Sequence, residues 1–364
     1  MSNNFTKMAY ANADEMVLGD ATMTAQTISG RDLFLTALKG GKTSRPAVFS
    51  ADQTGTYELM EKVSSYWPEA ICNAGEMAKL AATAHTILGF DAVRVPFCQT
   101  IEAEVFGSVL REGGSVNVPS ISHHRYNLGE PPTFPEDFLS KGRIPELIEA
   151  VKILKDTLGD SAAVIGGIVG PFSIAGNILD VTALLGACMK NPDSITPYLE
   201  VAEQAGTMLG KALIAAGADV ICIEDMLASL DLISPTIFRN IAWPWEKKQI
   251  QQLQEVPTIL HICGKVDPVI VDLVNTGVSA LSLDIKVDIR AAKATLARVG
   301  KKIPLIGGID CIRTLLQKTP EDVENEALDA LDDGYDIIAP CCSIPPATPT
   351  ENLLAMVRAV KESS

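Results

Sequence analysis

The sequence predicts an α/β protein of one domain, a (β/α)8 TIM barrel with an insertion after its second strand. Eight short runs rich in β-branched residues alternate with longer helical patterns along the 364 residues. The runs are apolar on both faces, which is typical of a parallel sheet covered by helices on both sides. No glycine-rich phosphate loop follows the first run, where the sequence reads "RPAVFSADQTG". A doubly wound open sheet is therefore the weaker interpretation.

The expected elements follow one another in regular order. The eight expected strands cover residues 45–50, 91–97, 162–170, 218–225, 257–263, 280–284, 303–310 and 335–342. Helical patterns cover residues 75–89, 144–159, 195–217, 266–277, 288–297, 319–334 and 350–363. Several of these patterns end in glycine, a residue that commonly ends a helix. Before the first strand, Ser29 is placed to cap a helix whose apolar face carries Leu33, Phe34 and Leu38.

Two further segments lie outside this alternation. Residues 1–22 are polar and without periodicity, so we expect an N-terminal arm there, followed by the barrel over residues 23–364. The stretch from about 98 to 160 is longer than one crossover connection and is rich in turn residues. We expect it to form the insertion, at the mouth of the barrel.

Composition excludes several classes of function. Hydrophobic residues make up 47% of the chain and charged residues 21%, the balance of a globular protein with a large core. The formal charge of −15 repels nucleic acid, and no basic stripe offers a local exception. No apolar run reaches the roughly 18 residues of a membrane helix, and no export signal is recognisable. The sequence therefore predicts a cytoplasmic protein, without a membrane or nucleic-acid partner, whose eight cysteines are reduced thiols.

A histidine and a cysteine stand at the end of the fifth expected strand. His261 and Cys263 are two positions apart, so both side chains point to the same face. Barrel enzymes carry their chemistry at the carboxyl ends of the strands, and the eighth expected strand ends there in Cys341 and Cys342. One imidazole and two thiolates are ligands that zinc prefers, and three protein ligands indicate a catalytic site. Pro340 disturbs the alternation, so periodicity leaves Cys341 and Cys342 as alternatives, and a buried structural histidine with small core thiols is the competing interpretation.

Carboxylates stand at other strand ends. We interpret Asp225 and Asp284 as candidate catalytic residues, which could orient metal ligands or receive protons. Glu104, after the second strand, and Asp310, after the seventh, are candidate substrate-binding residues. The alternative for each carboxylate is a helix cap or a salt bridge in a loop.

Two sequence blocks carry a family resemblance. "LHICGKVDPVI" (260–270) and "DIIAPCCSIPPATPTENLLAMVRA" (336–359) resemble the zinc-binding signature of corrinoid methyltransferases in the uroporphyrinogen decarboxylase superfamily, above all the methylcobamide:coenzyme M methyltransferases. The resemblance runs from about Met23 to the C-terminus and implies the same barrel. It places the zinc ligands on His261, Cys263 and Cys342. Cys341 takes a position where similar proteins usually have glycine.

The resemblance implies a reaction and its partners. Zn²⁺ binds a thiol acceptor such as coenzyme M and lowers its pKa, and the thiolate takes the methyl group from a methylated corrinoid. The corrinoid, a methylcobamide, is carried by a separate corrinoid protein that docks over the mouth of the barrel. Three alternatives are another acceptor such as tetrahydrofolate, uroporphyrinogen decarboxylase activity, and a non-catalytic corrinoid-binding protein. Decarboxylation is the weaker of these, because "ADQTGTY" (51–57) lacks the arginines that would hold a polyanionic substrate.

Overall fold

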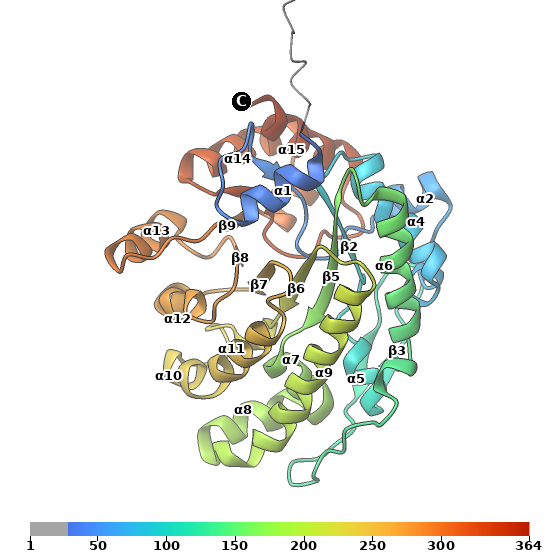
Figure 1. Ribbon diagram of the computed structural model, residues 1–364, viewed down its shortest axis with the longest axis vertical. Coiled ribbons are helices and arrows are strands. Elements are labelled where there is room, and N and C mark those ends of the chain that lie inside the picture. The colour runs from blue at the N-terminus through green and yellow to red at the C-terminus, as the bar shows by residue number, and fades with distance from the viewer. Residues whose placement is uncertain (1–27, 364) are drawn as a thin grey trace, which may run out of the picture.

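Eight parallel strands form the centre of the protein in a computed structural model that describes residues 28–363. The order around the sheet is β1-β10-β9-β8-β7-β6-β5-β2, so that each strand lies beside its neighbours in sequence, and β1 and β2 meet at the seam. The peptide N–H of Asp91 donates to the carbonyl of Val48 across this seam, at 2.9 Å. Figure 1 shows the helices arranged around the strands. The predicted (β/α)8 barrel is confirmed.

Each predicted strand is present, with shorter bounds. The strands are β1 (Ala47–Val48), β2 (Ala92–Val95), β5 (Ala163–Val169), β6 (Val220–Glu224), β7 (Thr258–Ile262), β8 (Ala280–Leu283), β9 (Leu305–Ile309) and β10 (Ile337–Pro340). All of their residues are buried, as expected for a sheet that is covered on both sides.

The helices follow the strands with a few additions. The α-helices are α1 (Gly30–Leu38), α2 (Tyr57–Val63), α3 (Glu69–Cys72), α4 (Ala74–Thr86), α5 (Ile101–Phe106), α6 (Ile144–Leu158), α7 (Pro171–Leu179), α8 (Val181–Lys190), α9 (Thr196–Ala215), α10 (Pro235–Ile237), α11 (Trp243–Gln252), α12 (Ile270–Val274), α13 (Ile289–Arg298), α14 (Pro320–Asp333) and α15 (Thr350–Glu362). The helix predicted over 266–277 is shorter than expected, because a 3₁₀ turn at Asp267–Val269 precedes α12.

The segment between β2 and α6 contains the elements of the expected insertion. It carries α5, then β3 (Val109–Arg111) and β4 (Ser120–His123), which pair as an antiparallel hairpin apart from the barrel. Helix α6, within the predicted range of 98–160, is the regular helix that covers β2 and β5. The predicted N-terminal arm, residues 1–22, lies outside the described residues.

The interior of the barrel is apolar at the amino ends of the strands. Alternate strand residues point inward there and form one cluster with α1, which closes this end. The ring of Phe34 in α1 packs on Phe49, just after β1, with 4.6 Å between the ring centroids. As predicted, Ser29 caps α1: its hydroxyl accepts a hydrogen bond from the Asp32 N–H at 3.1 Å. The amino end of the barrel is therefore a packed core.

At the carboxyl ends of the strands, the interior becomes polar. Arg94 of β2 is buried and lies across the barrel, where it pairs with Glu224 of β6. A Cβ atom on Gly167 of β5 would lie only 2.3 Å from a guanidinium nitrogen of Arg94. A glycine at this position of β5 therefore leaves the space that the arginine occupies.

Among residues 28–363, no single helix is long and apolar enough to cross a bilayer. Helices α7 and α8 reach that length and apolar composition only when taken together, and they are bent by 112°.

Candidate metal centre

The structure brings His261, Cys263 and Cys342 together. Their ligand atoms all lie within 4.8 Å of one another. The Nε2 atom of His261 is 3.1 Å from the sulfur of Cys263, which is 3.2 Å from the sulfur of Cys342. His261 is the fourth residue of β7, Cys263 follows the strand, and Cys342 stands two residues after β10. Two sulfurs and one imidazole nitrogen at this spacing fit the donor set of a tetrahedral zinc site.

The opposite nitrogen of the His261 ring is held in place. Its Nδ1 atom is 2.9 Å from the hydroxyl oxygen of Ser282, on the neighbouring strand β8. If Nδ1 carries the proton and donates to this oxygen, Nε2 is left free as a ligand atom facing the two thiols. Such a partner behind a ligating histidine fixes both its tautomer and its orientation.

The three groups shift one another's pKa values. The hydrogen bond from Cys263 lowers the pKa of Cys342 to about 5, against the effect of burial. Burial alone lowers the pKa of His261, but its contact with Cys342 raises this pKa to about 9. The hydrogen bond to Cys342, together with burial, raises the pKa of Cys263. Metal binding at this triad therefore releases protons, because ligand imidazoles are neutral and ligand thiols are ionised.

A buried polar network adjoins the triad. Arg94 pairs with Glu224 and also approaches Asp52, with 3.5 Å between Nη1 and Oδ1. The side-chain amide of Gln99 donates to Glu224, and the other carboxylate oxygen of Asp52 lies 4.0 Å from the sulfur of Cys342. Burial raises the pKa of Glu224 to about 8, although the charge of Arg94 opposes the shift. One fixed cation thus stands between two acids beside the triad.

The two predicted catalytic carboxylates hold backbone in place. Both oxygens of Asp225 accept hydrogen bonds from the N–H groups of Phe172 and Ser173, at 3.1 and 2.7 Å, and so cap α7 from outside that helix. Asp284 accepts from Gly264, the residue after Cys263, at 2.8 Å. Asp284 therefore supports the turn that carries a ligand, whereas Asp225 supports a helix.

The two predicted substrate-binding carboxylates also have partners. Glu104 forms an ion pair with Arg143, with 2.7 Å between Oε2 and Nε. Asp310 accepts hydrogen bonds from the N–H groups of Ile312 and Arg313 and so begins the helical turn after β9. The structure does not bring Glu104 or Asp310 into the His-Cys-Cys triad. Glu104 of α5 thus forms a salt bridge and Asp310 a helix cap, the kinds of contact that the sequence left open as alternatives to substrate binding.

A pocket of about 810 Å³ opens beside the triad. Its wall includes Asp52 and the segment directly after Cys342, Ser343 to Pro346. The insertion supplies another wall, which includes Arg111 and His124, and an aromatic side is formed by Trp67 and Phe97. No triad residue lines the pocket itself, but Asp52 in its wall lies 4.0 Å from the sulfur of Cys342, so the pocket ends beside the triad.

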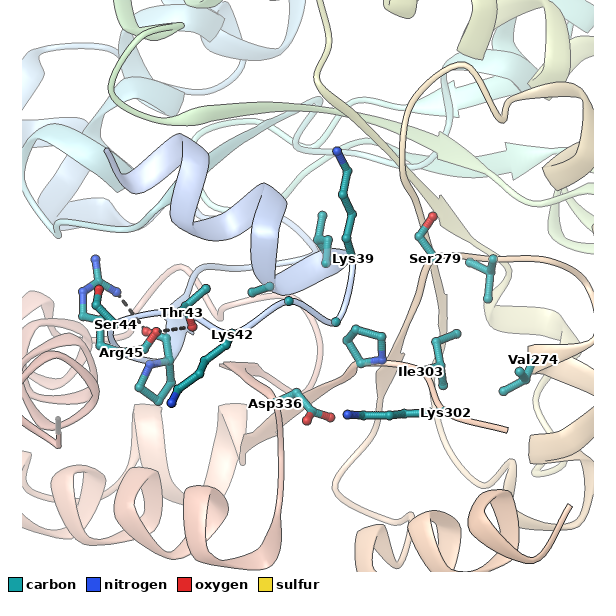
Figure 2. A pocket seen from close by; sticks show the side chains of 17 residues that line it. Lys39, Lys42, Thr43, Ser44, Arg45, Val274, Ser279, Lys302, Ile303 and Asp336 are labelled. Atoms are coloured by element: carbon teal, nitrogen blue, oxygen red, sulfur yellow. Dashed lines mark hydrogen bonds between the residues drawn. The ribbon is translucent and has the colours of Figure 1, made fainter. Parts of the chain in front are cut away.

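A second large pocket, of about 920 Å³, lies at the opposite end of the barrel. It is lined by the loop from α1 to β1 and by residues that precede β8, β9 and β10, such as Ser279, Ile303 and Asp336. Figure 2 shows that Lys39 and Lys42 extend from this loop in different directions. The pocket is larger than the one at the mouth but, unlike that pocket, it is not lined by Asp52 or Gln99 of the polar network beside the triad.

Three polar residues near the triad were not singled out from the sequence. They are Asp52, Arg94 and Ser282. An arginine inside the apolar run "AVRVPF" was a usable signal, because a buried strand rarely carries an unpaired cation. Asp52 and Ser282 had no such signal, since short polar residues at strand ends are common in loops and caps.

The barrel and the triad define the class of this protein: a (β/α)8 protein with three side chains that could hold a metal ion at the carboxyl ends of its strands. The sequence profile described as Uroporphyrinogen decarboxylase (URO-D) matches residues 29–363. The chain belongs to the uroporphyrinogen decarboxylase family.

Several relatives resemble the chain over nearly its whole length. Methylcobamide:CoM methyltransferase MtaA of Methanosarcina barkeri is 36% identical over 330 residues, 90% of this chain and 96% of the relative. Methylcobamide:CoM methyltransferase MtbA of Methanosarcina mazei is 37% identical over 328 residues, 89% of this chain and 95% of the relative. A solved structure, described as a methyltransferase from Methanosarcina mazei, has a TM-score of 0.88 at 36% identity and covers 92% of this chain and 99% of its own. The resemblance to methylcobamide:coenzyme M methyltransferases is confirmed.

Proposed function

We propose that this protein is a zinc-dependent methyltransferase, which moves a methyl group from a protein-bound methylcobamide to a thiol acceptor such as coenzyme M. The observation that carries the proposal is the triad of His261, Cys263 and Cys342 beside an open pocket. The names of the relatives MtaA and MtbA support the reaction and both substrates. A Zn²⁺ ion held by the three residues would supply the Lewis acidity that keeps the acceptor thiol ionised near neutral pH.

The surrounding residues position the triad. Ser282 orients the His261 ring, and Asp284 holds the turn after Cys263. The Arg94 guanidinium, fixed by Glu224, places a positive charge near a centre with two ligand thiolates. We therefore assign Asp284 a positioning role, whereas direct catalysis by Asp225 has no support in its contacts. Substrate binding by Glu104 and Asp310, and the cytoplasmic location, stay predictions.

The rim of the mouth fits a protein that carries the corrinoid. Large apolar side chains about half exposed stand in the segments that follow several strands and on the hairpin of β3 and β4: Val109, Val116, Leu232, Ile285 and Ile312. Apolar residues on separate segments around one opening form the kind of surface that protein partners cover. A corrinoid protein seated there would bring its cobalt over the pocket that leads to the triad.

Methyl transfer and metal content test the main proposal together. The purified protein is expected to demethylate methylcobalamin in the presence of coenzyme M and to contain one zinc per chain. The variant His261→Ala is expected to lose both, whereas the matched control Cys188→Ser, at a buried thiol on α8, keeps both. Transfer to tetrahydrofolate instead of thiols would support the alternative acceptor, and zinc retained by His261→Ala would overturn the ligand assignment.

A charge placed on the rim tests the docking surface. Leu232→Asp is expected to raise the KM for a methylated corrinoid protein about tenfold and to leave turnover of free methylcobalamin unchanged. Val299→Asp is the matched control, because Val299 is similarly exposed but lies between α13 and β9, at the opposite end of the barrel. Equal effects of the two variants would rule out this rim as the docking surface.

A further inference from the structure

Two cysteines outside the triad lie next to each other behind one of its ligands. Cys311 follows β9 and Cys341 follows β10, and their sulfurs are 3.7 Å apart. Both thiols are buried, with 3% and 6% of their residue surfaces exposed. A disulfide brings two sulfurs to about 2.0 Å, so this pair has to close by roughly 1.7 Å.

The sulfur of Cys311 also forms hydrogen bonds with the backbone of Cys342, a proposed metal ligand. The N–H of Cys342 donates to the sulfur of Cys311 at 3.3 Å, and the thiol of Cys311 donates to the carbonyl of Cys342 at 3.2 Å. Cys341 is joined to Cys342 by a peptide bond. A displacement of the Cys311 or Cys341 sulfur is therefore expected to move the backbone of Cys342.

We infer that Cys311 and Cys341 form a reversible disulfide that controls metal retention at the neighbouring triad, with a hydroperoxide as oxidant. This inference rests on the proposed metal centre. Once Cys263 and Cys342 hold a metal, their sulfurs are engaged, and Cys311 and Cys341 are the remaining close pair of thiols among the described residues.

The reaction balances in two steps. One thiol takes an oxygen atom from the peroxide, whose O–O bond breaks, and becomes a sulfenic acid; water leaves when the oxidant is hydrogen peroxide, and an alcohol leaves when it is an organic hydroperoxide. The second sulfur then attacks the first, the S–O bond breaks, and a water molecule carries away the oxygen and both remaining protons. The two thiols lose one electron each, and the peroxide gains both. Two small-molecule thiols reverse the step by exchange and become a disulfide themselves.

Oxidation is expected to weaken the metal site. The disulfide removes the S–H that donates to Cys342 and draws residue 341 toward β9, so the Cys342 sulfur moves relative to His261 and Cys263. Loss of such a supporting contact typically costs about tenfold or more in metal affinity. The oxidised protein is therefore expected to release zinc to a competing chelator about tenfold more readily, and a thiol reductant to restore retention.

Peptide mapping of zinc-loaded protein treated with hydrogen peroxide tests the inference without measuring methyl transfer. The expected product is a cross-linked pair of peptides that contain Cys311 and Cys341. Cys341→Ser is expected to lack this link and to keep its zinc after peroxide, while the control Cys188→Ser behaves as the wild type. Circular dichroism shows whether the variants fold.

Either of two results would overturn the inference. One is that wild-type Cys311 and Cys341 stay reduced or become separate sulfinic acids. The other is that Cys341→Ser loses zinc at the wild-type rate, which would place the damage on Cys263 and Cys342. Failure of the proposed function would be recognised separately, as untreated protein that binds no zinc or transfers no methyl group.

Discussion

The two ends of the barrel interior are built from the same strands but from opposite kinds of side chain. At the amino ends, inward positions such as Val220 and Ile259 pack against α1 without a polar group. Further along the same strands, four residues after Val220 and two after Ile259, the inward positions are Glu224 and His261. One strand therefore contributes to the stability of the barrel at one end and to its chemistry at the other, as in other barrels of this architecture.

The comparison shows where each end can tolerate change. The apolar end depends on close packing, so that lost volume is costly there. The polar end depends on pairing: each buried charge requires its partner, and removing one member leaves the other unpaired. Substitutions at the amino end are thus expected to change stability, and substitutions at the carboxyl end to change metal binding.

The largest expected effect is at the apolar end. Phe34→Ala removes the ring that packs on Phe49 and is expected to lower the free energy of unfolding by about 3–5 kcal/mol. Zinc content per folded chain is expected to stay at one. Chemical denaturation and metal analysis measure the two quantities, with Val299→Ala as an exposed control that changes neither. Loss of zinc from well-folded Phe34→Ala would show that the two ends are not independent.

At the polar end, Gly167→Ala tests the packing of Arg94. The added methyl group would lie 2.3 Å from the guanidinium, and Arg94 cannot withdraw without weakening its pair with Glu224. We expect a loss of about 1–3 kcal/mol in unfolding free energy, as for other overpacked sites. The same change at Gly186 of α8, where an added Cβ atom would meet no atom of another described residue within 4 Å, is expected to be neutral or to stabilise by up to about 1 kcal/mol. Equal thermal denaturation midpoints for the two variants would contradict this account.

The sequence predicted the fold more completely than the site. A run of consecutive apolar residues is enough to predict a parallel sheet covered on both sides, because the run itself shows that both of its faces are buried. The pairing of His261 with Cys263 could also be predicted from local sequence, because residues two positions apart on a strand point to the same face. By contrast, the pairing of Arg94 with Glu224 joins residues 130 positions apart, and nothing near either residue predicts it.

The roles of the carboxylates depended on three-dimensional contacts. Asp225 and Asp284 both end a strand in the sequence, yet one caps α7 and the other holds the turn beside a ligand. The cap could not be read from α7 itself, because its N-cap residue is Gly170, without a side chain to accept a hydrogen bond. A residue more than fifty positions away supplies the missing acceptor, a relation that local patterns do not encode.

Removal of the hydroxyl behind the histidine is expected to act on metal affinity alone. Ser282→Ala leaves Nδ1 of His261 without its partner at 2.9 Å. Zinc affinity is expected to fall about tenfold, up to a hundredfold, as for other partners of ligating histidines. Competition with a chromophoric chelator measures this change, and Ser282→Thr, which keeps a hydroxyl, is expected to retain most of the affinity. Unchanged affinity in Ser282→Ala would remove the positioning role of Ser282.

A buried carboxylic acid outside the barrel allows a test of how much a buried carboxylate lowers stability when it lacks hydrogen-bond partners, unlike those at the polar end. Glu246 of α11 is fully buried, and neither of its oxygens has a hydrogen-bond partner among the described residues. Burial, with a further contribution from the charge of Asp225, raises the pKa of Glu246 well above 4.5. The folded protein therefore holds this proton up to a higher pH than the unfolded chain does.

Unfolding should accordingly become easier as the pH rises above about 4.5, with a slope of up to about 1.4 kcal/mol per pH unit from this one group. Glu246→Gln mimics the protonated form and removes this contribution, so that the variant is expected to gain stability relative to the wild type between pH 6 and 7 and to match it near pH 4.5. Denaturation at a series of pH values measures the difference. Glu200→Gln, at an exposed carboxylate of α9, is the matched control and is expected to follow the wild-type profile. Parallel profiles for Glu246→Gln and the wild type would mean that Glu246 is ionised in the folded protein. Burial of a carboxylate without a hydrogen-bond partner would then lower stability less than the two ends of the barrel suggest.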